Sequence, residues 1–187
     1  MRNILFTLLL LISFSSFGQI NIEKPSGWFD LNSENSIAEN LKRAQLDNYE
    51  DLLNDMEIKQ STVLYMFTKY DIKTYAGISP TINAMLLRNI NGFSLKDMSN
   101  QGELMMQQLR NSGMEEVFLE STNIIKLNNG EKAAEIKSTF KFPGRPEKVE
   151  SKVYMFLISK DWGIQLSFSD LDNDKCDDIF KRVLENL

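Results

Sequence analysis

The densest group of potentially reactive side chains is the stretch "FSDLDNDKCDDIF", residues 168–180, which carries five aspartates and the only cysteine of the chain. Asp170, Asp172 and Asp174 match the first three alternating ligand positions of an EF-hand calcium loop. The cysteine, Cys176, follows two residues later. This composition therefore suggests two chemistries, which are coordination of a cation by oxygen and reactivity of a thiol.

The rest of the calcium-loop pattern does not match. The sixth loop position, where an EF-hand needs glycine, is Lys175, and the twelfth, where it needs a bidentate glutamate, is Lys181. We therefore interpret the stretch as the start of a helix over residues 174–187, capped by one of the three alternating aspartates. Asp177 and Asp178 would then lie in its first turn, where negative charge stabilises the helix.

Cys176 lies on the apolar stripe of this helix, one turn before Phe180, and is predicted to be buried. The alternative is a reactive thiol or a disulfide between two chains. The start of a helix lowers a thiol pKa, but the neighbouring aspartates oppose that effect. A single cysteine cannot close a loop within the chain, so the fold depends on its apolar core.

Other catalytic patterns are missing from the sequence. The chain contains no histidine, the commonest general base and a common zinc ligand. Nucleophile-elbow, P-loop and dinucleotide-binding motifs do not occur either. Carboxylate pairs such as Glu115 and Glu116 are interpreted as a solvated face. We expect a protein that is not an enzyme and has no catalytic, cofactor-binding or metal-binding residues.

The first 18 residues have the plan of a secretory signal peptide, because Arg2 precedes an apolar run at residues 4–14 and small residues follow at 15–18. Cleavage is expected between Gly18 and Gln19. The alternative is an uncleaved membrane anchor, but the apolar run is shorter than the roughly 20 residues of a spanning helix. A lipid anchor would need a cysteine at the cleavage site. Residues 19–187 are therefore predicted to form one domain in the periplasm or outside the cell.

The composition suits such a domain. The chain has 187 residues with a net charge of −5, and loss of Arg2 leaves 20 basic against 26 acidic residues. Nucleic-acid binding depends on neutralising phosphates, so this acidic balance argues against a nucleic-acid partner. No stretch after the leader approaches transmembrane length.

Hydrophobic periodicity predicts the order α-β-β-α-β-β-β-β-α. Ser94, with Asp97 three residues later, is the expected N-cap of the second helix, and Gly113 its stop. "NNG" predicts a tight hairpin. Short links favour an antiparallel sheet, and two strands that are apolar on both sides require cover on both faces. The expected helices are 33–56, 92–113 and 174–187, and the expected strands are 61–70, 81–90, 116–127, 131–142, 149–159 and 164–169.

Three further features have both a packing and a binding interpretation. Met98 and Met105 are expected in the core, with Met106 at its margin, although methionine also suits adaptable binding surfaces. The loop "FPGRP", residues 142–146, is either a plain connection or an apolar and cationic tip. Trp28 and Trp162 frame a pocket or close the ends of the sheet.

Several segments resemble the PsbP-like superfamily, which includes periplasmic proteins of the DcrB kind. They are "PSGW" near the mature start, "ISPTINAMLLRNI", "SLKDMSNQGELMMQQL", "NNGEKAAEIKSTFKFPGR", "VYMFLISKDWGIQLSFS" and "DDIFKRVLENL". The resemblance implies an α+β fold in which helices cover both faces of an antiparallel sheet, an α/β/α sandwich used mostly for binding and assembly. The helix predicted at 33–56 is longer than this pattern implies. The resemblance supplies no functional residues.

Three functional hypotheses remain. The first is an exported, non-enzymatic binding or accessory protein that docks a protein partner in the cell envelope. The second is a carrier of an apolar small molecule in a cavity between sheet and helix, which methionine and phenylalanine would line. The third is an envelope hydrolase that uses two carboxylates about 5–10 Å apart.

Overall fold

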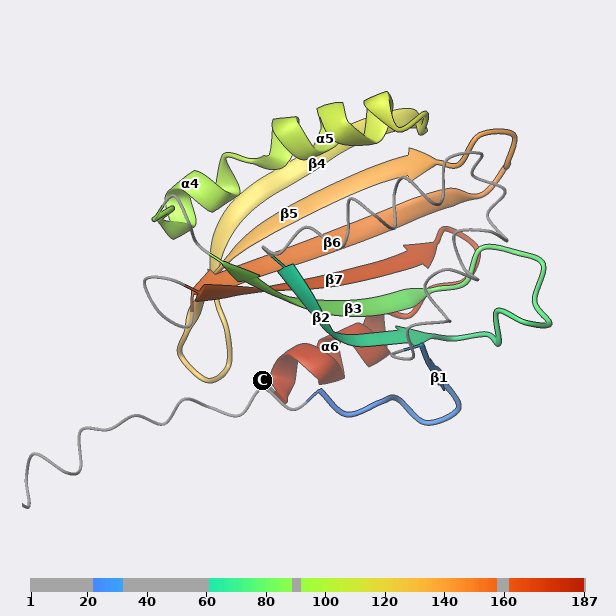
Figure 1. The fold of residues 1–187 in the computed structure, drawn as a ribbon, viewed down its shortest axis with the longest axis horizontal. Helices are drawn as coiled ribbons and strands as arrows, with labels where there is room; N and C mark the ends of the chain where they lie inside the picture. The colour runs from blue at the N-terminus through green and yellow to red at the C-terminus, as the bar shows by residue number, and fades with distance from the viewer. Residues whose placement is uncertain (1–21, 32–60, 89–91, 158–161, 187) are drawn as a thin grey trace, which may run out of the picture.

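In a computed structural model, residues 22–31, 61–88, 92–157 and 162–186 are described. The described residues form an antiparallel sheet of seven strands in the order β1-β2-β3-β7-β6-β5-β4 (Figure 1). This confirms an antiparallel sheet in a mixed α+β fold. The strands are β1 (Phe29–Asp30), β2 (Ser61–Thr68), β3 (Thr81–Arg88), β4 (Glu115–Lys126), β5 (Lys132–Lys141), β6 (Lys148–Leu157) and β7 (Trp162–Leu171), and the helices are α4 (Leu95–Ser99), α5 (Gly102–Asn111) and α6 (Asp177–Glu185).

The four strands from β4 to β7 form the predicted meander, and β7 then pairs with β3. The β4–β5 hairpin closes where the sequence predicts it, because Gly130 has a φ of 91° and the Leu127 N–H donates to the Glu131 carbonyl at 2.8 Å. Glycine adopts positive φ without steric cost. Figure 1 shows this hairpin at one end of the sheet and the β2–β3 and β5–β6 loops at the other.

Two core clusters take alternate side chains of the same strands, as a pleated strand requires. On β6, Tyr154 and Phe156 belong to one cluster, and Val153 and Met155 belong to the other. We call the first the aromatic cluster; its largest members are Trp28, Phe67, Tyr154, Phe156, Phe168 and Phe180. We call the second the methionine cluster; its buried members are Met98, Ala134, Ile136, Val153 and Met155.

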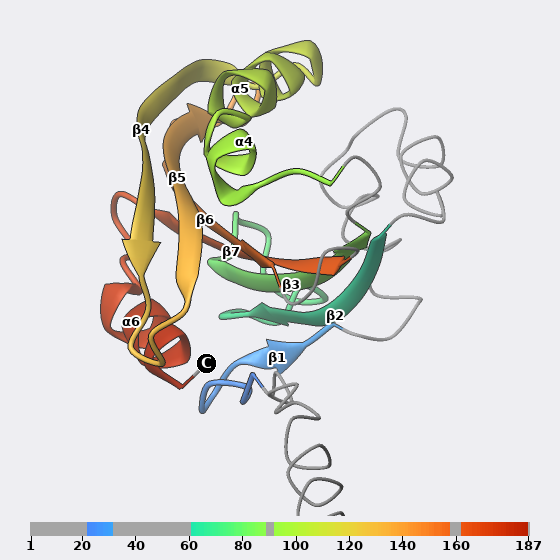
Figure 2. The same ribbon diagram turned by 90° about the vertical axis from the view of Figure 1, so that its left-hand side faces the viewer.

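Helices α4 and α5 lie inside the curve of β4 and β5, whereas α6 packs in the aromatic cluster (Figure 2). Each described helix covers only part of the sheet, so cover of both faces, as in an α/β/α sandwich, stays a prediction. The helix expected at 33–56 and the leader at 1–18 lie outside the described residues. Among the residues described, none of the helices is long and apolar enough to cross a membrane.

The second predicted helix starts and stops as expected but is broken in the middle. Ser94 and Asp97 form a reciprocal capping box, in which the Asp97 N–H donates to Ser94 Oγ at 3.3 Å and the Ser94 N–H donates to Asp97 Oδ2 at 2.9 Å. The Ser94 hydroxyl also donates to Asp97 Oδ2 at 2.6 Å, and this bond, followed by the one from the Ser94 N–H, holds the pKa of Asp97 below its usual value. Gly113, with a φ of 85°, follows the helix end. The chain is interrupted at residues 100–101, between α4 and α5.

This interruption resets the helical phase and corrects one expectation about the core. Met106, expected at its margin, is fully buried, whereas Met105 is only half-buried. Met98 is buried as predicted. A continuous helix would have placed Met105 on the inward stripe with Met98, because those positions are two turns apart.

Candidate functional site

The acidic stretch at residues 168–180 contacts residues of the β2–β3 connection at one end of the sheet. Lys69 and Tyr70 were expected to end a strand, but β2 stops at Thr68. The strand stops because the Tyr70 N–H donates to the side-chain Oγ of Ser79 at 3.0 Å instead of to a strand carbonyl. Both side chains then turn to the acidic stretch that precedes α6.

Asp174 is the centre of this contact. One oxygen of its carboxylate pairs with the Lys69 ammonium, and the other accepts the Tyr70 hydroxyl at 2.8 Å. The pKa of Lys69 is raised chiefly by its hydrogen bond to Asp174, and the same carboxylate raises the pKa of Tyr70. Asp174 therefore ties the β2–β3 connection to the start of α6.

Asp170 holds the start of α6 in a second way. Its Oδ2 accepts the Cys176 N–H at 2.9 Å, next to the first helical residue, Asp177. Burial raises the pKa of Asp170, and the Cys176 N–H opposes that rise. The helix begins three residues later than predicted, and its N-cap position, Cys176, makes no side-chain cap. Asp170 is one of the three aspartates expected to cap this helix, and it acts from the end of β7 by accepting the N–H of the N-cap residue.

The other charged groups around the start of α6 are also paired. Lys152 pairs with Asp177, and Lys175 pairs with Glu150. Lys152 holds the pKa of Asp177 below its usual value. An open depression at this point has charged and apolar side chains in its lining, which consists of Lys175, Cys176, Asp177, Asp178, Ile179 and Arg182. Each of these pairs fixes α6 to the sheet.

The structure separates the residues that a calcium loop would bring together. Asp170 is buried against the Cys176 N–H, Asp174 binds Lys69, and Asp172 is exposed. Lys181 lies beyond the loop, 3.8 Å from Glu185 on the surface of α6. Within the described residues, no three histidine, cysteine or acidic side chains are grouped as a metal site requires.

Cys176 is buried, as predicted, in the aromatic cluster. Burial raises the pKa of its thiol to about 11, a larger effect than the nearby Lys69 ammonium, which lowers it. A thiol with this pKa is almost entirely protonated at neutral pH, and the thiolate is the reactive form. Of the other residues considered from the sequence, Trp28 packs edge-on against Phe180 at 6.4 Å, and Glu116 pairs with Lys141 at 2.8 Å.

An exposed aromatic side chain lies directly on this anchored group. Tyr75 packs against Tyr70 with ring centroids 4.3 Å apart and ring planes tilted by 31°, yet 39% of Tyr75 is exposed. Its loop is folded by Asp71, whose backbone carbonyl accepts the Tyr75 N–H at 2.8 Å and whose side chain accepts the Lys73 N–H at 2.8 Å. The Tyr75 ring is thus presented to solvent on a fixed support.

The loop at residues 142–147 adds a cation at the same end. The Arg145 N–H donates to the Phe142 carbonyl at 3.0 Å to close its turn, and Gly144 has a φ of 68°. Arg145 Nη2 reaches the carbonyl of Ala76 in the β2–β3 loop at 3.5 Å. The two loops are therefore in contact. The loop at 142–146, interpreted as an apolar and cationic tip, thus lies beside the loop that carries Tyr75.

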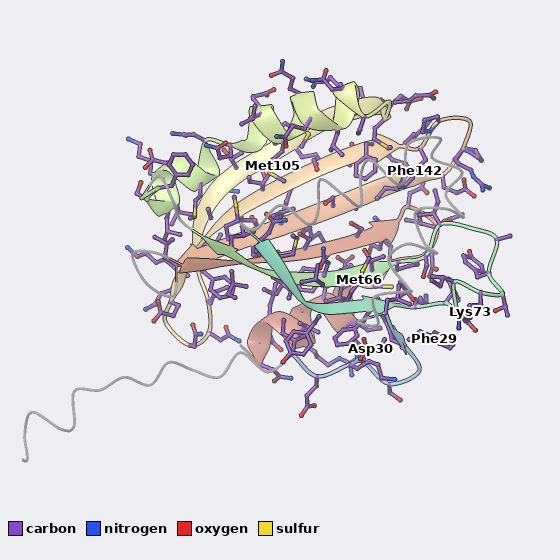
Figure 3. The ribbon with its side chains drawn as sticks, viewed as in Figure 1. Phe29, Asp30, Met66, Lys73, Met105 and Phe142 are labelled. Carbon is purple, nitrogen blue, oxygen red and sulfur yellow. The ribbon has the colours of Figure 1, made fainter. Side chains whose placement is uncertain are left out.

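Figure 3 shows Phe29, Lys73 and Phe142 toward this same end of the molecule. Phe29 is 42% exposed on β1, opposite Thr68 of β2. We call the group formed by Phe29, Tyr75 and Arg145 the loop-end surface. Sequence reasoning identified Arg145 and the acidic stretch but missed Tyr75. The run "KYDIKTY", two tyrosines and two lysines between strands, is the signal that could have indicated it.

Comparison with known proteins shows a distant likeness to a solved structure. No protein family matches the chain, and no curated protein matches it. Among solved structures, the chain is similar to LpqN of Mycobacterium tuberculosis, described as involved in cell envelope biogenesis, with 14% identity over 89% of this chain and 80% of that chain and a TM-score of 0.49. A likeness of this size carries no inference about function, and the resemblance to the PsbP-like superfamily stays a prediction.

Proposed function

We propose that the chain is an exported, non-enzymatic accessory protein that docks a protein partner in the cell envelope through the loop-end surface. The observation that carries this proposal is the arrangement of Tyr75, which is exposed and yet packs against Tyr70, whose hydroxyl is in turn held by Asp174. The leader predicted at residues 1–18 supports the location.

A tyrosine held in place loses little conformational entropy on binding. Interface residues with large energetic effects are enriched in tyrosine and arginine, and pre-organised side chains bind better because less ordering remains to be done. Tyr75 supplies such an aromatic anchor, and Arg145 supplies a cation beside its loop. The partner that fits this pair has an apolar pocket for the ring and a carboxylate near its rim.

The charged residues beneath the surface have a different role. Asp174, Asp170 and Asp177 each bind a group that joins α6 to the sheet. These aspartates support the docking surface, which explains why so many of them lie close together in the sequence. The carrier and carboxylate-hydrolase hypotheses remain alternatives, and the following experiment separates the carrier from docking.

A photoreactive side chain at position 75 tests the proposal in the exporting cell. Cross-linking at position 75 is expected to give one defined protein product, which mass spectrometry identifies. The matched control is position 104, because Leu104 is 49% exposed on α5. Equal products at both positions, or no protein product at position 75, contradict docking, and a bound small molecule released on denaturation favours the carrier.

The identified protein then allows a quantitative test with the purified pair. Tyr75→Ala is expected to weaken binding by about tenfold or more, and Tyr75→Phe by less than about threefold, because the stacked ring supplies most of the contact. Isothermal titration calorimetry measures both. Equal loss in the two variants would assign the effect to the hydroxyl group and contradict the proposed aromatic anchor.

A further inference from the structure

The outer edge of β4 has two halves with different properties. In the first half, residues 115–120, the register with β5 shifts twice and Glu116 has a φ of 47°. Arg110 Nη2 also donates to the Val117 carbonyl at 3.2 Å. Bulges and occupied backbone groups prevent an edge from accepting another strand. This half of the edge is closed.

The second half, residues 121–126, is regular. Its residues pair with β5 one for one from Ser121 opposite Lys137 to Lys126 opposite Lys132, and among the described strands β4 has a neighbour only on its β5 side. The Leu127 N–H donates toward β5. Since antiparallel residues alternate in direction, the backbone N–H and C=O groups of Thr122, Ile124 and Lys126 point away from β5.

These outward residues are also exposed. Thr122, Ile124 and Lys126 all lie at the surface, and 49% of Ile124 is accessible. Figure 2 shows α5 beside the beginning of β4, whereas the arrowhead at the end of β4 lies away from α5. An exposed, regular edge with β-branched side chains is a template for pairing with another strand.

The charges along β4 indicate which strand fits. Acidic residues lie in the first half, and Glu120 ends that half; the second half ends with Lys126. When two copies of such a strand run antiparallel, the acidic end of each lies beside the lysine of the other. Opposite charges across a strand pair are stabilising, whereas like charges are destabilising.

We propose that two copies of this protein pair through the second half of β4, antiparallel about a two-fold axis, to form one continuous sheet. Asn123 lies at the axis, Ile124 of each copy lies opposite Thr122 of the other, and Glu120 lies beside Lys126. Paired copies of one surface are the commonest form of oligomer. The paired segment is short, so the dimer forms reversibly, with a dissociation constant in the range of about 1–100 µM.

This contact is independent of the docking proposal, because the end of β4 lies at the hairpin end of the sheet, opposite the β2–β3 and β5–β6 loops (Figure 1). A dimer of this form presents two loop-end surfaces facing away from each other. It would therefore bring two docked partners to one unit.

Sedimentation velocity of the exported chain over about 1–200 µM tests the pairing. The unmodified chain is expected to shift from monomer to dimer, and Ile124→Lys to weaken dimerisation by about tenfold or more, because it places two lysines beside the axis. The control is Phe118→Lys, on the closed half of the same strand; Phe118 is 60% exposed. This variant is expected to dimerise as the unmodified chain does.

A charge exchange tests the register. Glu120→Lys and Lys126→Glu are each expected to weaken the dimer several-fold, and the double variant to restore it. A chain that stays monomeric at every concentration overturns the proposal, as does a dimer that Phe118→Lys abolishes or one in which the double variant is the weakest. Unfolding in urea, with unchanged midpoints, shows that the variants are folded.

Discussion

The aromatic and methionine clusters take alternate side chains of the same strands, but they draw on different parts of the chain. The aromatic cluster joins Ile22 and Trp28, near the beginning of the described chain, to Phe180 and Val183 of α6, near its end. All residues of the methionine cluster lie within 95–157, and its buried members include the small side chain of Ala134. One cluster thus closes the fold over its whole length, and the other joins neighbouring elements.

The difference also appears in how the side chains meet. Phe180 stacks on Phe168 with centroids 4.8 Å apart and receives the edge of Trp28, and Tyr154 packs edge-on against Phe168 at 5.8 Å. Aromatic pairs of this kind stabilise beyond the area that they bury. Methionine is unbranched and fills irregular space with less specificity. Global stability is therefore concentrated in the contacts between α6 and the rest of the aromatic cluster, whereas α4 and α5 are held by contacts with neighbouring elements.

The largest effect is expected from Phe180→Ala, which removes the ring that links α6 to Phe168 and Trp28. Loss of a buried phenylalanine costs about 3–5 kcal/mol in the free energy of unfolding. Urea denaturation measures it, and Phe118→Ala, at a residue that is 60% exposed, is the control expected within about 0.5 kcal/mol of the unmodified chain. If the alanine variant does not fold, Phe180→Leu gives a smaller loss in the same direction.

A smaller effect is expected from Met98→Ala in the methionine cluster, about 2 kcal/mol. Its mark should be local: amide exchange in α4 and α5 becomes faster, while exchange in α6 changes only as much as the global loss requires. Met98→Leu keeps the volume and is expected to cost less than about 1.5 kcal/mol. Equal or greater cost for Met98→Ala than for Phe180→Ala would contradict the ranking of the two clusters.

The parts of the fold that the sequence predicted are those with local signals. The Asn-Gly hairpin and the Ser94 capping box each depend on residues a few positions apart, and the structure contains both. The break between α4 and α5 has no such signal, because Asn100 and Gln101 are compatible with a helix. The break lets α5 lie against β4, where Gly102 is so close to Thr122 that an added Cβ would lie 2.7 Å from its methyl group.

The candidate site was predictable only in part, for a similar reason. Sequence indicated that Asp170, Asp172 or Asp174 holds the start of the last helix, and Asp170 does so within the same stretch, but the partners of Asp174 come from across the fold. Lys69 and Tyr70 lie 105 and 104 positions before Asp174 in the chain. Nothing in the local pattern reveals such a pairing. The loop at 142–146 was noticed for its composition, but its contact with Ala76 needed the tertiary structure.

The smallest effect is expected at the ion pair that joins the β2–β3 connection to the start of α6. Lys69→Met removes the ammonium that binds Asp174, and because both side chains are partly exposed the loss at neutral pH is expected to be about 1 kcal/mol or less. The folded pKa of Lys69 is raised above its ordinary value of 10.5 by Asp174, so its contribution is full below 10.5 and is lost as the pH rises through the raised value. Tyr70, whose pKa is also raised, acts in the same direction above its ordinary value of 10.0.

Urea denaturation at pH 8 and at pH 11 is therefore expected to show a smaller alkaline loss of stability in Lys69→Met than in the unmodified chain, and the smallest loss in the double variant with Tyr70→Phe. An unchanged alkaline loss in the double variant would mean that the Asp174 contacts do not hold the start of α6, and that the aromatic cluster alone does so.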